Sequence, residues 1–278
     1  MRTLRDRAFW GVCFAALALI ATPSIWVLIS IVAQAAPVMD WHLLTHTTAQ
    51  HGLLNAILGT LYLLAGVGVF AGTIGVAAGI WLAEFGTGRL ARSLRFYSEI
   101  LAGMPSIVIG YIGYITLVVQ FGWGYSYLAA VIALSALVLP YIVKTTEVAL
   151  RQVPTFLREA AAGLGMTQTA TVWRILLPPA IPGVLSGLVV ALAISTGELA
   201  PLLFTAGFSD GLPPLNWFGH PVPYLTDVIY TDLSLPGATE QATAAAAGVF
   251  SLILLIILIV VGRLLTRRAR KATARMSL

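Results

Sequence analysis

The stretch REAAAGLGMTQTATVWRILLPPAIPG, residues 158–183, decides what kind of chain this is. It mixes charged, small and helix-capping residues, and long apolar runs stand on either side of it. Pro154 suits the first turn of a helix, Gly165 is a residue that ends helices, and Thr167 is a good N-cap for a second helix. Pro178–Pro179 is expected to end that second helix. The pattern therefore predicts a short helix, a glycine corner and another short helix.

Apolar residues recur at helical spacing in the first of these short helices. Its apolar face comprises Phe156, Leu157, Ala160, Ala161 and Leu164. Its opposite face comprises Thr155, Arg158, Glu159 and Ala162. The periodicity alone fits two roles equally well: an amphipathic connector that lies on a membrane surface, and a surface that docks a partner.

The composition excludes a water-soluble globular protein. The chain has 278 residues, of which 59% are hydrophobic and only 10% are charged. A soluble domain is nearer half apolar and a quarter charged, so this chain must have lipid as its solvent. The single cysteine, Cys13, lies inside an apolar run. We expect it to be a small buried residue rather than part of a disulfide or a metal site.

Six stretches are long and apolar enough to cross a bilayer, which takes about 20 mostly apolar residues. They are residues 9–32, 56–83, 97–120, 127–150, 182–207 and 243–265. Backbone polar groups in lipid must bond within their own segment, so we expect helices rather than strands. Gly103 and Pro105 interrupt the third stretch. The fold class is therefore an all-α integral membrane protein with six transmembrane helices.

The basic residues set the orientation of these spans. All 16 Lys and Arg lie in four clusters, and the remaining connections hold acids without any Lys or Arg. The clusters are Arg2, Arg5 and Arg7; Arg89, Arg92 and Arg95; Lys144, Arg151, Arg158 and Arg174; and Arg263, Arg267, Arg268, Arg270, Lys271 and Arg275. This asymmetry predicts that both termini are cytoplasmic. The net charge of +5 is thus a topology signal rather than a nucleic-acid-binding surface.

Residues 1–36 have a second interpretation as a cleaved signal peptide, because Ala33-Gln34-Ala35 resembles a cleavage site after a basic start. The apolar run of about 25 residues exceeds the usual signal core, so we expect the segment to be retained. We divide the chain into an N-terminal helix with its outer connection (1–55), a five-helix unit (56–265) and a basic tail (266–278).

Three elements of the opening stretch together resemble the EAA loop of ABC importer permeases: Glu159-Ala160-Ala161, Gly165, and Ile175-x-Leu177-Pro178. The resemblance implies a type I importer permease fold. Residues 154–178, named the coupling loop from here on, would carry a coupling helix that docks in a groove of a cytoplasmic ATPase. Glu159 would contact the ATPase or pair within the loop. The residues implied in coupling are Phe156, Leu157, Glu159, Ala160, Ala161, Leu164, Gly165, Ile175, Leu177 and Pro178.

The sequence contains no motif for nucleotide hydrolysis or for hydrolytic chemistry. G-x-x-x-x-G-K-[ST], H-E-x-x-H and G-x-S-x-G are all missing from it. His42, His46 and His51 lie in an outer connection without metal partners. We therefore expect no cofactor or metal bound by this chain, with ATP and Mg²⁺ used by a partner ATPase.

The fifth span contains STGELAPLLFTAG, residues 195–207, in which Glu198 is the most interior charge of the chain. A carboxylate inside a membrane is a candidate functional residue; the alternative is a side chain that reaches up to the outer surface. Gly197 and Pro201 flank it, which predicts a kink or a break that frees backbone groups.

This stretch resembles the GETAPLLFTA signature of PstA-type permeases, one of the two permease kinds in bacterial phosphate ABC importers. GMPSIVIG at 103–110 resembles a third-span segment of the same lineage. Two positions depart from the pattern, since Leu199 replaces a Thr and Ile194 stands where an Arg is usual. The resemblance implies phosphate as cargo and a bacterial inner-membrane location. It also implies a homologous second permease (PstC-like), a dimer of ABC ATPases (PstB-like) and a periplasmic phosphate-binding protein (PstS-like) as partners.

The expected substrate pathway follows from these two stretches. We expect hydroxyl groups from Ser106, Ser195 and Thr196, and positive charge from the partner permease, to meet the anion. The pathway residues are Gly103, Pro105, Ser106, Ser195, Thr196, Gly197, Glu198 and Pro201.

Several alternatives stay open. The cargo could be another oxyanion (sulfate, molybdate or phosphonate), and a different class would be a membrane scaffold or sensor without transport. Glycines 68, 72, 75 and 79 allow close helix approach, within the chain or between subunits. The outer connection 208–242 is either a docking site for a periplasmic binding protein or a plain surface loop.

Overall fold

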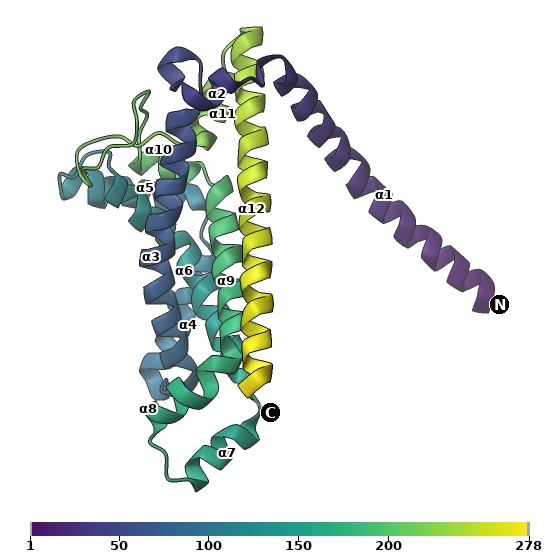
Figure 1. The fold of residues 1–278 in the computed structure, drawn as a ribbon, viewed down its shortest axis with the longest axis vertical. Coiled ribbons are helices and arrows are strands. Elements are labelled where there is room, and N and C mark those ends of the chain that lie inside the picture. Colours follow the sequence, from purple (N-terminus) through teal and green to yellow (C-terminus); the bar gives the residue numbers. More distant parts are fainter. Residues whose placement is uncertain (1, 277–278) are drawn as a thin grey trace.

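The chain folds into an elongated bundle of helices, from which the first helix extends away (Figure 1). The computed structural model describes residues 2–276, with the side chains of residue 6 and of residues 8–269. Six of the basic residues that set the predicted orientation lie outside the described side chains: Arg2, Arg5, Arg7, Arg270, Lys271 and Arg275.

Within residues 2–276, five helices are long and apolar enough to cross a membrane, and a bent pair of helices gives a sixth span. The five are α1 (Arg2–Ala35), α3 (Leu54–Glu84), α6 (Tyr127–Arg151), α9 (Leu177–Gly197) and α12 (Ala238–Met276). The all-α, six-span prediction is confirmed. The described side chains of α1 are exposed almost throughout, and α1 contacts α12 near its end, where Ala35 is buried. The prediction that Cys13 is buried is wrong, because the residue lies on this exposed helix.

The third span is bent rather than straight. α4 (Gly88–Gly103) meets α5 (Ser106–Gly113) and its π-helical continuation η3 (Tyr114–Gln120) at an angle of 105°. Met104 and Pro105 both have a ψ of 135°, far from the helical value, and proline has no N–H with which to continue α4. The interruption expected from Gly103 and Pro105 is confirmed, but the predicted start at residue 97 is wrong. The first helix begins well before residue 97, and the chain changes direction at the Gly-x-Pro sequence.

The fifth span is continuous with the coupling loop. α8 (Gln168–Thr171), the π-helical segment η4 (Val172–Leu176) and α9 follow one another without a break. The prediction that Pro178–Pro179 ends a separate short helix is wrong. Leu177 N–H donates to the Val172 carbonyl, five residues back, so the hydrogen-bond ladder opens where the prolines offer no donor.

At the end away from the coupling loop, α9 stops at Gly197, as the sequence predicts. Glu198 has a ψ of 133°, and a new helix, α10 (Ala200–Thr205), begins two residues later with a proline in its first turn. The break expected from Gly197 and Pro201 is confirmed.

The core lies where α3, α6 and α9 meet. Glycines bring α3 and α6 together, because a Cβ on Gly79 would lie 2.6 Å from Thr146 Cβ and 2.8 Å from the Val143 carbonyl oxygen. A Cβ on Gly68 would instead meet Leu192 of α9 at an ordinary 3.6 Å. The glycine spacing thus serves packing within the chain, closest at the end of α3 near the coupling loop. Core residues shared by the three helices are Val67, Ala71, Leu134, Val138, Ile142 and Ala191.

The corner of the coupling loop forms as the sequence predicts. α7 (Thr155–Gly163) is followed by Gly165 at φ +69°, a left-handed conformation that favours glycine. Gly165 N–H donates to the Ala162 carbonyl and Met166 N–H to the Ala161 carbonyl, the paired bonds of a Schellman motif. The Thr167 side chain then caps α8 by accepting from Ala170 N–H at 3.3 Å.

The opposite end of the bundle is covered by short elements: η1 (Ala36–Val38), α2 (Trp41–Thr45), η2 (Thr48–Gln50) and α11 (Leu225–Leu233). α11 is fixed to two spans by hydrogen bonds. Leu225 N–H donates to Thr60 of α3 at 3.0 Å, and the Thr226 hydroxyl donates to the Glu198 carbonyl at 2.9 Å. The outer connection therefore holds the break in the fifth span in place.

Candidate functional site

The coupling loop presents part of its first helix to solvent and part to the bundle. Phe156 is 61% exposed and Leu164 is 81% exposed, with Ala160 between them on the same face. Leu157 and Ala161, one position further along, turn inward: Leu157 packs against the cluster around Leu150, Leu176 and Ala180, and Ala161 is buried. The apolar set that the sequence places on one face thus splits into an exposed ridge and an inner contact.

The remaining predicted coupling residues lie elsewhere in the coupling loop. Glu159 is exposed and forms no ion pair among the described side chains. Ile175, Leu177 and Pro178 are half-buried at the base of the fifth span, where Ile175 and Leu177 pack against the same inner cluster. The structure therefore brings the EAA-type residues together at one end of the bundle.

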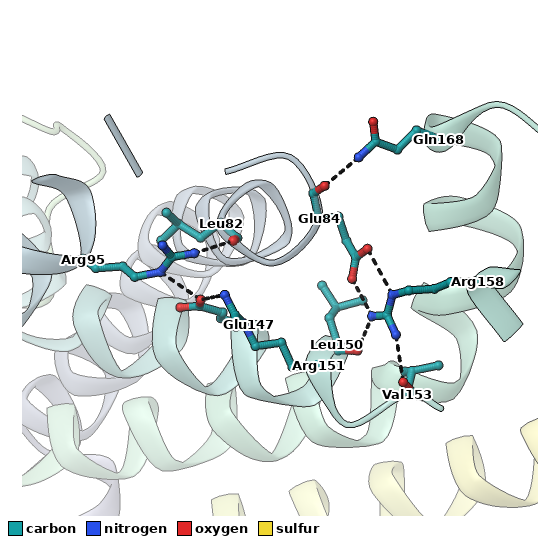
Figure 2. A network of polar contacts seen from close by, with 9 residues as sticks. All are labelled: Leu82, Glu84, Arg95, Glu147, Leu150, Arg151, Val153, Arg158 and Gln168. Carbon is teal, nitrogen blue, oxygen red and sulfur yellow. Dashed lines mark hydrogen bonds and ion pairs between the residues drawn. The ribbon is translucent and has the colours of Figure 1, made fainter. Parts of the chain in front are cut away.

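Arg158 ties this loop to two spans (Figure 2). Its guanidinium donates to the Glu84 carboxylate at 2.7 and 3.4 Å. It also donates to the Leu150 carbonyl at 2.9 Å and to the Val153 carbonyl at 2.8 Å. Beyond the glycine corner, the Gln168 amide donates to the Glu84 backbone carbonyl at 2.6 Å. Glu84, the last residue of α3, thus receives contacts from both arms of the loop.

A second arginine joins the same pair of spans (Figure 2). Arg95 of α4 donates to the Glu147 carboxylate of α6 at 3.0 Å and to the Leu82 carbonyl of α3 at 2.7 Å. Arg151 also pairs with Glu147, at 2.8 Å. Glu147 is 5% exposed, so a buried carboxylate is compensated by two cations. Lys144, assigned from the sequence to the connection after the fourth span, lies inside α6.

A small cavity lies where the two broken spans meet. Its volume is about 230 Å³, and it is lined by Leu101, Ala102, Met104, Ser106, Leu137, Tyr141, Ile194 and Glu198. The Ser106 hydroxyl lies next to the Glu198 carboxyl group. The helix breaks at residues 104–105 and 198–199 therefore face one another across the pair formed by Ser106 and Glu198. None of the described residues that line the cavity is basic.

The other predicted pathway residues lie around this cavity rather than in it. Ser195 and Thr196 are buried and donate their hydroxyls to carbonyls four residues back in α9, at 3.0 and 2.9 Å. Pro201 is buried against α5, where a Cβ on Gly110 would lie 2.8 Å from Pro201 Cα. Gly103, Pro105 and Gly197 form the two breaks. Of the three predicted hydroxyls, only that of Ser106 lines the cavity.

Carboxylates gather in the outer connection. Asp227 of α11 is 5% exposed, and burial, followed by the nearby charges of Asp232 and Asp210, raises its pKa to about 6. The folded protein therefore holds this proton more tightly than the unfolded chain does. Ionisation lowers stability as pH rises from about 4 through 6, by at most about 3 kcal/mol. The cost persists at neutral pH.

Comparison with known proteins identifies the class of this chain. The family of binding-protein-dependent transport system inner membrane components matches residues 75–271, which include the coupling loop, the cavity and both arginine networks. The chain belongs to this family. It is a multi-pass membrane protein and a permease component of an ABC transporter.

Named relatives of this permease span nearly its whole length. It is 43% identical over 272 residues to "Phosphate transport system permease protein PstA 2" of Mycobacterium bovis, covering 97% of this chain and 90% of the relative. It is 38% identical to "Phosphate transport system permease protein PstA" of Haemophilus influenzae, covering 84% of each. It is 36% identical to the protein of that name in Xylella fastidiosa, covering 86% and 84%.

Solved structures show that the fold is that of a type I ABC importer permease, as expected. A chain of the inward-facing methionine ABC transporter MetNI aligns with a TM-score of 0.65 at 23% identity, over 78% of this permease and 95% of that chain. A chain of a bacterial alginate ABC transporter aligns with the same TM-score at 16% identity, over 93% and 96%.

Sequence reasoning missed the polar contacts that hold this permease together at the end of the bundle that carries the coupling loop. Arg158 and Glu84 are 74 residues apart, and Arg95 and Glu147 are 52 apart, so no periodic pattern joins them. One signal was available, because Glu84 and Glu147 are acids at the basic ends of apolar helices. Carboxylates in such positions need cationic partners.

Proposed function

We propose that this permease is one of the two membrane subunits of an ATP-driven importer that carries inorganic phosphate into a bacterial cell. The observation that supports this most strongly is the 43% identity over 97% of the chain to a protein named for phosphate transport. A second homologous permease would complete the membrane unit. Both chain termini would face the cytoplasm, and the membrane would be the bacterial inner membrane.

The exposed ridge of Phe156, Ala160 and Leu164 would dock in a groove of a separate ATPase subunit, of which the complex holds two. Large apolar side chains that are 61% and 81% exposed on a cytoplasmic helix favour a protein contact, since a lone solvent-facing helix gains nothing from them. ATP and Mg²⁺ would be bound by the ATPases, and a periplasmic phosphate-binding protein would deliver the cargo on the opposite side.

The cavity between the broken spans would belong to the translocation pathway. Ser106 offers a hydroxyl, and the chain ends of α4 and α9 offer backbone groups freed by the breaks. A phosphate anion beside Glu198 needs compensating positive charge. That charge would come from the second permease, which would pair with Glu198 when no cargo is present.

Uptake by proteoliposomes tests the proposal. The chain, co-expressed with its neighbouring transport subunits, should co-purify with an ABC ATPase and accumulate ³²P-phosphate only with ATP and the binding protein. A ten-fold excess of unlabelled phosphate should abolish the signal, whereas sulfate and molybdate should leave it unchanged. Competition by sulfate or molybdate as strong as that by phosphate would reassign the cargo. Purification without any ATPase would count against transport itself.

A further inference from the structure

The four hydrogen bonds of Arg158 place one guanidinium at the cytoplasmic ends of two spans. Its side chain is 28% exposed and that of Glu84 is 10% exposed, so the contact is largely removed from water. A guanidinium presents five donors in a fixed plane, which suits simultaneous binding of a carboxylate and of carbonyl groups. A lysine ammonium has no such geometry.

The acceptors of Arg158 lie at or just beyond the ends of two helices. Leu150 is in the last turn of α6 and Val153 follows the end of that helix, where the carbonyl groups carry partial negative charge. Glu84 adds a full negative charge at the C-terminus of α3. One cation of α7 therefore binds groups at the ends of two helices at once, which links the positions of those ends.

The pair of spans that Arg158 joins behaves as one packed unit. Gly75 and Gly79 bring α3 against Ile142 and Thr146 of α6 with no room for a side chain between the backbones. Arg95 repeats the arrangement from α4, with its own carboxylate and carbonyl acceptors on the same two helices. Displacement of α7 is thus coupled to α3 and α6 together.

α6 runs from the residues that Arg158 contacts to the wall of the cavity. Leu137 and Tyr141 of α6 line the space that holds Ser106 and Glu198. Apart from Arg158, α7 contacts the bundle through inward-facing Leu157 and Ala161, and its outer ridge is exposed. The hydrogen bonds of Arg158 are therefore the directional contacts that connect α7, which carries the docking ridge, to the helices behind the cavity wall.

We propose that Arg158 is a positioning residue for energy coupling, which links the movement of α7 to the α3–α6 pair through the Glu84 carboxylate and the carbonyl groups of Leu150 and Val153. This rests on the proposed function, in which α7 docks the ATPase. Arg158 itself contacts neither nucleotide nor cargo. Its loss should separate ATP hydrolysis from transport without preventing ATPase binding.

The test compares R158Q with R174Q in the complete complex reconstituted in proteoliposomes. Arg174 is a matched control, since it is an exposed arginine of the same loop with no ion pair among the described side chains. Uptake is followed with ³²P-phosphate and hydrolysis by ADP formation, so that phosphate released from ATP does not enter the measurement. R158Q should bind the ATPase normally and lose at least ten-fold in phosphate imported per ADP formed, whereas R174Q should match the wild type.

Two further variants keep the test decisive if R158Q assembles poorly. R158K should show an intermediate ratio, because an ammonium reaches the carboxylate or the carbonyls but does not span both. E84Q should lower the ratio, and the R158Q/E84Q double variant should be no worse than R158Q alone.

A wild-type ratio in R158Q, or additive losses in the double variant, would overturn the positioning role. Loss of ATPase binding in R158Q would overturn it as well, since the residue would then act in docking. Failure of the proposed function looks different: the wild-type complex itself would then lack ATP-driven phosphate uptake.

Discussion

Replacing Gly79 by alanine tests whether glycine sets the distance between α3 and α6. The new Cβ would lie 2.6 Å from Thr146 Cβ and 2.8 Å from the Val143 carbonyl oxygen. Non-bonded carbon atoms prefer about 3.5–4.0 Å, so the helices would have to separate by roughly 1 Å. One of the two opposing atoms belongs to the backbone, and a rotamer change therefore does not relieve the contact.

The expected magnitude is the difference between two effects. Overpacking of a well-packed interface costs about 1–3 kcal/mol, and replacing glycine by alanine inside a helix returns about 0.5–1 kcal/mol. G79A should therefore lose roughly 1–2 kcal/mol of unfolding free energy. G68A is the control, because its Cβ would meet Leu192 at an ordinary contact distance of 3.6 Å. Its unfolding free energy should rise by about 0.5–1 kcal/mol, since alanine is favoured over glycine inside a helix.

The assay is unfolding of the purified permease in mixed micelles with increasing SDS, followed by fluorescence of its 7 tryptophans. The two variants should differ by roughly 1.5–3 kcal/mol, which is a factor of about 10–150 in the unfolding equilibrium. Equal stability of G79A and G68A would refute the reasoning, since the two positions would then have the same surroundings.

Three other changes test separate parts of the molecule. E198Q should lower phosphate uptake at least ten-fold with normal assembly, because the pairing charge is lost; wild-type uptake would remove Glu198 from the pathway. L164E should abolish co-purification of the ATPase but leave subunit stability unchanged, since Leu164 is 81% exposed; retained binding would exclude the ridge as the dock. D227N should be more stable than the wild type at pH 7.5. The difference in unfolding free energy between D227N and the wild type should be about 1 kcal/mol smaller at pH 5, because the wild-type carboxyl group, with a pKa of about 6, is mostly protonated there in the folded protein. A difference that does not change with pH would contradict the role of the buried acid.

Hydropathy and helix-ending residues carried most of what could be predicted of the fold. Apolar runs located the spans because lipid forces each run to satisfy its own backbone. Gly165 and Thr167 located the corner, since a left-handed residue and an N-cap are local requirements. The break at Gly197 followed for the same reason. These features depend on a few neighbouring residues, and they are therefore visible in the sequence.

Features that depend on distant partners were not visible. The direction of α5 after the bend is fixed by its contact with α10, where Gly110 meets Pro201. The inward turn of Leu157 depends on a cluster formed by three other segments. Periodicity marks Leu157 as apolar, but it does not distinguish an inner contact from an exposed ridge. Of the candidate site, the sequence supplied Glu198 and Ser106, and only the fold placed them side by side.

The unbroken helix through η4 has a mechanical consequence. Residues 168–197 form one continuous helix of 30 residues, tied to Glu84 by Gln168 at its lower end and adjoining Glu198 at its upper end. Its part above η4 is α9, with 21 residues and a length of about 32 Å. If α9 pivots at its lower end, where the hydrogen-bond ladder is open, a tilt of about 5° carries its upper end through roughly 3 Å. An angular change too small to disturb side-chain packing at the base is thus large enough at the top to open or close a passage for an ion.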